Sequence, residues 1–154
     1  MLMGLNGFRP ICSAMNKKPI VLKIVVGGIV FNNGKVLIIQ RSSSEATYPN
    51  LWELPSGKKE PLEKVSDAIL REVKEETGLN VQIRSVCNVI DYVIEKESEI
   101  RDATQINFIL DIIGQNIIAL SPEHQKHAWI TLSEIGNYNL SKKIKETMTT
   151  AFNN

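Results

Sequence analysis

One segment constrains the fold of this chain more than any other: residues 57–79, GKKEPLEKVSDAILREVKEETGL. Its apolar spacing predicts an amphipathic helix over 64–77, ended by Gly78, a residue that readily adopts the left-handed conformation of a helix C-terminus. Glu72, Glu75 and Glu76 crowd the last turns of that helix. Three like charges so close together repel one another and destabilise the helix. A role other than helix formation must therefore account for them.

A helical wheel places these carboxylates on the apolar side of the helix. With successive residues turned by about 100°, Glu76 and Glu75 lie within about 60° of Glu72, in the same arc as Val65 and Ile69. The solvent side is elsewhere, around Asp67, Arg71 and Lys74. A solvated charged face, the usual explanation of a charge run on a helix, therefore does not fit.

Crowded, partly desolvated carboxylates repel one another unless a cation neutralises them, and Arg71 alone cannot offset three. Hard divalent cations prefer oxygen ligands, and Mg²⁺ is commonly held by a few carboxylates together with substrate phosphates. The cluster therefore predicts a magnesium site that binds a phosphorylated ligand together with the ion.

The rest of the chain predicts short strands around this helix. We expect strands at 20–31, 36–41, 51–57, 80–94, 104–114 and 128–132, and a second helix over 133–152 with Ser133 as its N-cap. The first strand has a potential break at Gly27-Gly28, and an Asn-Gly turn joins it to the second. The order β-β-β-α-β-β-β-α does not alternate, so it predicts an α+β sandwich with a mixed or antiparallel sheet.

Composition narrows the class of protein. The 154 residues, 43% of them hydrophobic, suit one domain with a buried core, which we place at 19–154 behind a disordered extension of residues 1–18. Met15 is an alternative start. The formal net charge of +1 gives no reason to expect nucleic-acid binding driven by bulk charge, and no apolar run is long enough for a membrane span. Cys12 and Cys87 are far apart, so we expect reduced thiols and a cytoplasmic protein.

The charged segment resembles the Nudix box of the MutT-like hydrolases, G-x5-E-x7-R-E-U-x-E-E-x-G-U, where U is a bulky aliphatic residue. The matching positions are Gly57, Glu63, Arg71, Glu72, Val73, Glu75, Glu76, Gly78 and Leu79. The segments LWELPSG and EHQKHAWITLSEI add to a likeness that extends over residues 20–150. It implies the Nudix α/β/α sandwich and Mg²⁺-dependent hydrolysis, with Mn²⁺ as a substitute, of a nucleoside diphosphate linked to another moiety.

The resemblance also implies roles for individual residues. Glu72, Glu75 and Glu76 would bind Mg²⁺ together with the Gly57 carbonyl, and one of these glutamates or Glu123 would accept a proton from the attacking water. Arg71 would orient the glutamates, and Glu63 would support the turn into the helix. Arg41 would hold a substrate phosphate, unless it is only a surface charge. Trp52 is a candidate substrate contact, as a stacking surface for a base.

Three positions depart from the family pattern. Ser56-Gly57 stands where Gly-Gly is usual, Leu62 replaces a glycine before the first glutamate, and Lys64 replaces a capping Ser or Thr. These departures affect the conformation of the loop and leave every metal ligand in place.

Other residues carry weaker signals. His124 and His127 are three residues apart, but a zinc site would need further nitrogen or sulfur ligands. Cys87 is expected to be a small buried hydrophobe. The remaining aromatic candidates for base stacking, each equally a core or rim residue, are Tyr48, Tyr92 and Trp129.

Within the family, the sequence favours an enzyme that cleaves a nucleoside triphosphate to the monophosphate and pyrophosphate, as in housecleaning of the nucleotide pool. The nearest alternative is an ADP-ribose or nucleotide-sugar pyrophosphatase. Alternatives of other classes are a non-catalytic nucleotide-binding module and an isoprenoid diphosphate isomerase, which needs a well-placed catalytic Cys. The expected partner is a small nucleoside phosphate, with no nucleic acid and no membrane, bound by a monomer or homodimer.

Overall fold

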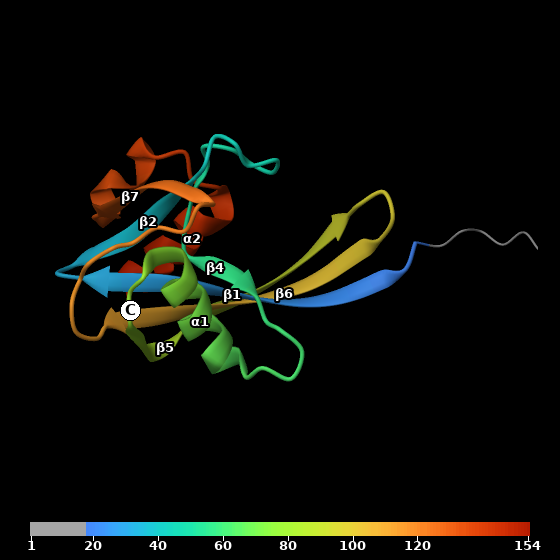
Figure 1. The fold of residues 1–154 in the computed structure, drawn as a ribbon, viewed down its shortest axis with the longest axis horizontal. Helices are drawn as coiled ribbons and strands as arrows, with labels where there is room; N and C mark the ends of the chain where they lie inside the picture. Colours follow the sequence, from blue (N-terminus) through green and yellow to red (C-terminus); the bar gives the residue numbers. More distant parts are fainter. Residues whose placement is uncertain (1–17) are drawn as a thin grey trace, which may run out of the picture.

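A mixed β-sheet lies between a helix on one face and a helix on the other (Figure 1). The computed structural model describes residues 18–154. The strands are β1 (Ile20–Asn32), β2 (Lys35–Arg41), β3 (Trp52–Glu53), β4 (Ser56–Lys58), β5 (Val81–Glu95), β6 (Ile100–Ile112) and β7 (His124–Ile130). The helices are α1 (Val65–Thr77), the 3₁₀ helix η1 (Leu132–Asn137) and α2 (Lys142–Phe152). This architecture confirms the predicted α+β sandwich.

Strand β1 is the centre of the sheet. It runs parallel to β6 along almost its whole length, and β5 continues the sheet antiparallel beyond β6. On its other side β1 pairs with β2 only at Phe31 and Asn32, because β4 pairs with Val25–Gly27. Strand β2 also pairs with β3 and β7. The insertion of β4 beside β1 places residues 56–58 next to α1 (Figure 1).

Alternate residues of the central strands build two cores. Val26 and Val30 of β1 face α1 and pack with its buried residues Ile69 and Val73. Ile29 of β1 faces the other way and packs with Met148 of α2. Continuous apolar strands are expected where both faces of a sheet are covered.

The two glycines of β1 do not break the strand, contrary to one possibility raised by the sequence. A Cβ on Gly28 would lie 2.8 Å from Leu110 Cδ1 and 3.1 Å from Val73 Cγ2. The glycine therefore allows α1 to pack close to the sheet.

Helix α1 has the ends that its sequence predicts. Lys64 is the N-cap residue and its side chain makes no capping hydrogen bond. Gly78 adopts the left-handed conformation, with φ 75°, and its N–H donates to Lys74 O at 2.9 Å. Leu62, which replaces the usual glycine, also has a positive φ of 63° and a fully exposed side chain. The loop therefore carries backbone strain at Leu62, because a residue with a Cβ rarely adopts a positive φ.

The prediction of one helix over 133–152 is wrong. The chain forms η1, leaves the helical conformation at Tyr138 and starts again at α2. Leu140 explains the break, because its side chain is buried and residues 139–140 pair with Trp52 in extended conformation. Each helix has its own cap: Thr131, not Ser133, caps η1 through a capping box, and the Ser141 hydroxyl accepts from the Ile144 N–H at 3.3 Å.

Three strand boundaries also differ from the prediction. Strand β7 begins at His124 rather than residue 128, β6 spans 100–112 rather than 104–114, and the segment 51–57 forms two short strands separated by Leu54-Pro55. The extension predicted for residues 1–18 lies, apart from Lys18, outside the described residues. None of the helices in residues 18–154 is long and apolar enough to cross a membrane.

Candidate active site

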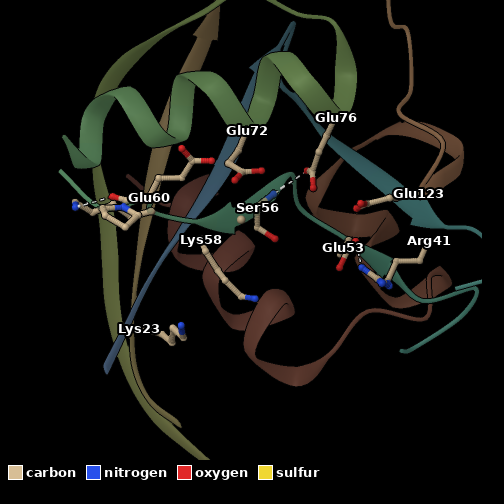
Figure 2. A pocket seen from close by; sticks show the side chains of 12 residues that line it. Lys23, Arg41, Glu53, Ser56, Lys58, Glu60, Glu72, Glu76 and Glu123 are labelled. Carbon is tan, nitrogen blue, oxygen red and sulfur yellow. Dashed lines mark hydrogen bonds and ion pairs between the residues drawn. The ribbon is translucent and has the colours of Figure 1, made fainter. Parts of the chain in front are cut away.

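A cavity of about 670 Å³ lies beside β4, on the side where the carboxylates of α1 emerge (Figure 2). Its lining is strongly charged, with five carboxylates and four basic side chains: Glu53, Glu60, Glu72, Glu76, Glu123, Lys23, Arg41, Lys58 and Lys59. The carboxylates of Glu72 and Glu76 extend from α1 toward β4, and Lys23 and Lys58 lie on the opposite side (Figure 2). An anionic ligand and a cation can therefore be held in the same space.

Glu72 lies against Gly57 of β4. A Cβ on residue 57 would overlap the Glu72 carboxylate, so only glycine fits there. Burial raises the pKa of Glu72, and the neighbouring Arg71 opposes that rise. The glycine thus allows a partly desolvated carboxylate to lie next to the backbone of residue 57.

Arg71 forms ion pairs with three carboxylates on and before α1. Its Nε and Nη2 donate to the two oxygens of Glu63, at 2.7 and 3.0 Å, and its Nη1 donates to Glu72 at 2.8 Å and to Glu75 at 3.3 Å. Nη2 also donates to Lys58 O at 3.1 Å. This forked contact lowers the pKa of Glu63 to about 2. Arg71 therefore fastens the loop of residues 58–63 to the helix.

The helical wheel is wrong in placing Arg71 on the solvent side. Its side chain is only 24% exposed, because residues 58–63 fold over that side of α1. A wheel contains the helix alone and cannot show a preceding loop that covers it.

Glu76 is the most buried carboxylate of the cavity. Its Oε2 accepts a hydrogen bond from the Ser56 N–H at 2.9 Å (Figure 2). Burial raises its pKa to about 9, and the nearby charges of Glu53, Glu72 and Glu123 add to the rise. In residues 18–154 no basic side chain forms an ion pair with it. Ionised Glu76 therefore has no ionic partner among the described residues, a costly state for a buried charge.

Glu75 occupies a different position from its neighbours. Its side chain is 59% exposed, contacts Arg71 and is not part of the cavity lining. With side chains placed as they are, no three His, Cys, Asp or Glu residues of 18–154 converge as direct ligands of one ion. The donors available in the cavity are nevertheless hard oxygen atoms around a carboxyl group that has no ionic partner, which fits a divalent cation that retains part of its water shell.

Arg41, the candidate phosphate ligand, lines the cavity from the end of β2. Its guanidinium donates to Glu53 at 3.3 Å, to Glu45 at 3.2 Å and to Thr47 O at 2.8 Å. It therefore also ties the loop that follows β2 to the wall of the cavity.

Glu53 is a cavity residue that the sequence analysis missed. Besides Arg41, it contacts His124 Nε2 at 3.0 Å, and the other nitrogen of this fully buried imidazole lies 3.0 Å from Ser121 Oγ. Neighbouring residues of a strand face opposite sides of the sheet. An apolar Trp52 that packs inward therefore predicts that Glu53 faces the cavity, and this signal could have found it. His124 is buried whereas His127 is exposed, which does not favour a shared zinc site.

The candidate stacking residues are divided between the cores and a second cavity. Trp52 packs edge-to-face on Tyr138, with ring centroids 5.1 Å apart, and Trp129 packs against the core beneath α1. Tyr48 and Tyr92 line a second cavity of about 470 Å³ on the α2 side of the sheet. Trp52 lies outside the lining of both cavities.

The two cavities adjoin each other. Glu53 and Ser56 line both. The first cavity is charged, while apolar side chains such as Leu54, Ile90 and Ile144 contribute much of the second. A molecule with a phosphorylated end and a flat, less polar end matches this pair of cavities.

Comparison with known proteins gives the family. The model of the NUDIX domain matches residues 21–152. The chain belongs to the Nudix family. As a Nudix hydrolase it acts on phosphorus anhydride bonds, and enzymes of this family generally use divalent metal ions.

Individual relatives have modest sequence identity but cover most of the chain. The nucleoside triphosphatase NudI of Salmonella agona (strain SL483) is 26% identical over 135 residues, which are 82% of this chain and 94% of the relative. A MutT protein from Methanosarcina mazei Go1 has a TM-score of 0.72 and 26% identity, covering 89% of this chain and 95% of that one. An ADP-ribose pyrophosphatase from Streptococcus suis 89-1591 shares the fold, with a TM-score of 0.64 and 20% identity over 84% of this chain and 87% of its own.

Proposed function

We propose that this protein is a Mg²⁺-dependent pyrophosphohydrolase that cleaves a nucleoside triphosphate to the monophosphate and pyrophosphate, and that it acts on the cytoplasmic nucleotide pool. The observation that carries the proposal is the junction of the two cavities at Glu53 and Ser56. A triphosphate in the charged cavity leaves its nucleoside in the apolar one, with the anhydride bonds next to α1.

The residues of α1 and β4 are assigned to the metal. Glu72, Glu76 and the Gly57 carbonyl would hold Mg²⁺, and Glu75 would join them after its side chain turns inward. Mg²⁺ held by these residues would supply charge screening for the phosphates and would orient the attacking water and lower its pKa. Arg71 keeps Glu72 in position through the contacts described above.

The remaining cavity residues act on the substrate and on the proton of water. Lys23, Lys58 and Arg41 supply positive charge to the phosphates. A carboxylate of the cavity, either on α1 or Glu123 in the loop before β7, accepts the proton from the attacking water. A proton acceptor must lie within hydrogen-bond reach of that water, so both positions remain candidates.

The relatives support a triphosphate over ADP-ribose. The nucleoside triphosphatase relative aligns over 94% of its length at 26% identity, whereas the ADP-ribose pyrophosphatase is similar at the level of the fold. An inference about substrate requires more than a shared fold.

The test compares kcat/KM for nucleoside triphosphates, deoxynucleoside triphosphates and ADP-ribose with Mg²⁺ and then with Mn²⁺. We expect the best triphosphate to exceed ADP-ribose by at least about tenfold, or about 1.4 kcal/mol of transition-state stabilisation. The Glu76→Gln variant, purified identically, controls for contaminating phosphatases. A higher kcat/KM for ADP-ribose would overturn the proposal.

A further inference from the structure

Four polar side chains form a row of hydrogen bonds beside the second cavity, and three of them, Gln105, Asn107 and Thr147, line it. We name this row, which also contains Asn88, the amide ladder. Gln105 Nε2 donates to Asn107 Oδ1 at 2.9 Å, Asn107 Nδ2 donates to Asn88 Oδ1 at 2.8 Å, and Asn88 Nδ2 donates to Thr147 Oγ1 at 3.2 Å. The ladder therefore joins β6, β5 and α2 in one direction of hydrogen bonding.

Two members of the amide ladder are buried. Asn107 and Thr147 are 1% and 2% exposed. Gly27 of β1 makes room for it, because a Cβ there would overlap Asn107 Oδ1 and lie 3.1 Å from Gln105 Nε2. Buried amides are costly unless their hydrogen bonds are made, so each member fixes the orientation of the next.

Its two ends differ. At the Thr147 end the ladder fastens α2 to β5, which is a structural role. At the other end Gln105 is half-buried and lines the cavity, and within residues 18–154 its only side-chain hydrogen bond is the one donated to Asn107. Anchoring α2 does not account for Gln105.

The chemistry of Gln105 indicates what it can bind. A carboxamide has one carbonyl acceptor and two N–H donors. With one N–H fixed on Asn107, the carbonyl oxygen and the second N–H remain for a ligand, in the plane of the amide. Such a pair matches an edge that offers a donor beside an acceptor, as carboxamide side chains match the edges of nucleobases.

The walls around Gln105 fit the rest of a base. Ile90 of β5 pairs with Gln105 across the sheet, and Tyr92 of β5 and Ile144 of α2 line the same cavity with aromatic and apolar surface. A mainly apolar cavity with a few fixed polar groups is the usual form of a site that orients a flat organic ligand.

We propose that Gln105 is the specificity-determining residue that selects the base of the nucleotide, and that Asn107 holds it in the orientation that does so. The inference rests on the proposed function, since it assigns the nucleoside to the second cavity. All four bases present a donor next to an acceptor, but the amino bases adenine and cytosine place them in the opposite order to the keto bases guanine and uracil. An amide that Asn107 holds in one orientation therefore selects one of these two classes and leaves the other unpaired.

The first experiment measures kcat/KM of wild type and Gln105→Met for ATP, CTP, GTP and UTP. Met has a similar length and cannot form the two hydrogen bonds. The ratio of the best to the worst nucleotide should fall at least about tenfold, a change typical of one lost bidentate pair of hydrogen bonds to a base. The inhibition constant of inorganic tripolyphosphate, which has no base, should stay within twofold. Gln82→Met, an exposed glutamine of β5, should change neither value.

An unchanged ratio in Gln105→Met would overturn the inference, and so would an equal loss for the nucleotides and tripolyphosphate. If Gln105→Met does not fold, as judged by its thermal melt, Gln105→Glu replaces it. Its carboxylate has two acceptor oxygens and no donor, so it should shift preference toward bases that offer two donors.

A binding measurement separates this inference from the proposed function. Calorimetric titration with AMP, CMP, GMP and UMP needs no turnover and remains informative if ADP-ribose is the preferred substrate. Wild type should discriminate among the four, and Gln105→Met should bind them more equally. Equal affinity of wild type for all four would overturn the assignment of Gln105 whichever substrate is hydrolysed.

Discussion

The carboxylate of Glu72 occupies the space in which a Cβ on Gly57 would lie. This contact joins helix α1 to strand β4 at the candidate metal site. It explains why residue 57 is a glycine. It also predicts the effect of the smallest possible substitution.

Gly57→Ala should lower kcat/KM at least about a hundredfold, because it displaces Glu72, the proposed metal ligand, and a shift of about 1 Å is enough for such a loss. Gly136→Ala is the matched control, since a Cβ there meets no atom within 4 Å. Initial rates with Mg²⁺ and a thermal melt of both variants check this. Full activity in Gly57→Ala would mean that Glu72 is free to move without consequence.

Arg71→Lys should reduce kcat and lower the melting temperature. Lysine keeps the charge but loses the fork that binds both oxygens of Glu63, so the loop of residues 58–63 and Glu72 are no longer fixed together. Each kcal/mol lost corresponds to about 2–4 °C for a domain of this size.

The control for Arg71→Lys is Arg84→Lys. Arg84 also binds both oxygens of one carboxylate, that of Asp111, but outside the lining of both cavities. The Arg84→Lys variant should leave kcat unchanged. Equal effects of the two variants on kcat would show that Arg71 has no particular role at the site.

Local signals made much of the fold predictable. The Asn-Gly turn, the apolar alternation and the glycine after α1 each act within a few residues, and the structure follows them. The single helix predicted over 133–152 failed because Leu140 is fixed by its contacts with residues from β3, which lie far away in the sequence.

The candidate site was predictable where one helix contains it. Glu72 and Glu76 are one turn apart, so any helix brings them together, whereas Glu53 and His124 meet only through the pairing of β2 with β3 and β7. The exposed position of Glu75 follows from its contact with Arg71, which depends on the loop that covers the helix. The amide ladder, with members on three elements, left no local signal.

Arg41→Ala should raise KM about tenfold or more with little change in kcat. A charge-assisted hydrogen bond to a substrate phosphate is typically worth about 1.5–3 kcal/mol. Steady-state kinetics with the preferred triphosphate measure the effect.

Arg41 also holds the loop after β2 through Glu45, so the control is Glu45→Gln. That variant weakens the hold on the loop and keeps the cation. If the two variants raise KM equally, Arg41 acts on the loop and not on phosphate.

Metal-free protein should lose stability as the pH rises, because burial raises the pKa of Glu76 to about 9 from 4.5. Between these values the folded protein holds a proton that the unfolded chain has released, so the free energy of unfolding falls with increasing pH across this window. Glu76→Gln cannot titrate. In EDTA above pH 7 it should therefore be more stable than wild type and depend less on pH.

Denaturant melts from pH 5 to pH 9 measure this dependence, with the exposed Glu97→Gln as control. Added Mg²⁺ should stabilise wild type through binding to the folded state and stabilise Glu76→Gln less. A Glu76→Gln variant that unfolds more easily than wild type at all pH values would make Glu76 a structural residue.

The account as a whole depends on metal-dependent cleavage of a nucleoside triphosphate at this site. The most direct measurement is the rate of pyrophosphate release from a panel of nucleoside and deoxynucleoside triphosphates, by wild type and Glu76→Gln, with saturating Mg²⁺ and with EDTA. We predict monophosphate and pyrophosphate in equal amounts from wild type with Mg²⁺, no release in EDTA, and a loss in Glu76→Gln of at least about a hundredfold, since the ion contributes several kcal/mol to transition-state stabilisation. Release of orthophosphate and a diphosphate instead, or full activity of Glu76→Gln, would contradict it.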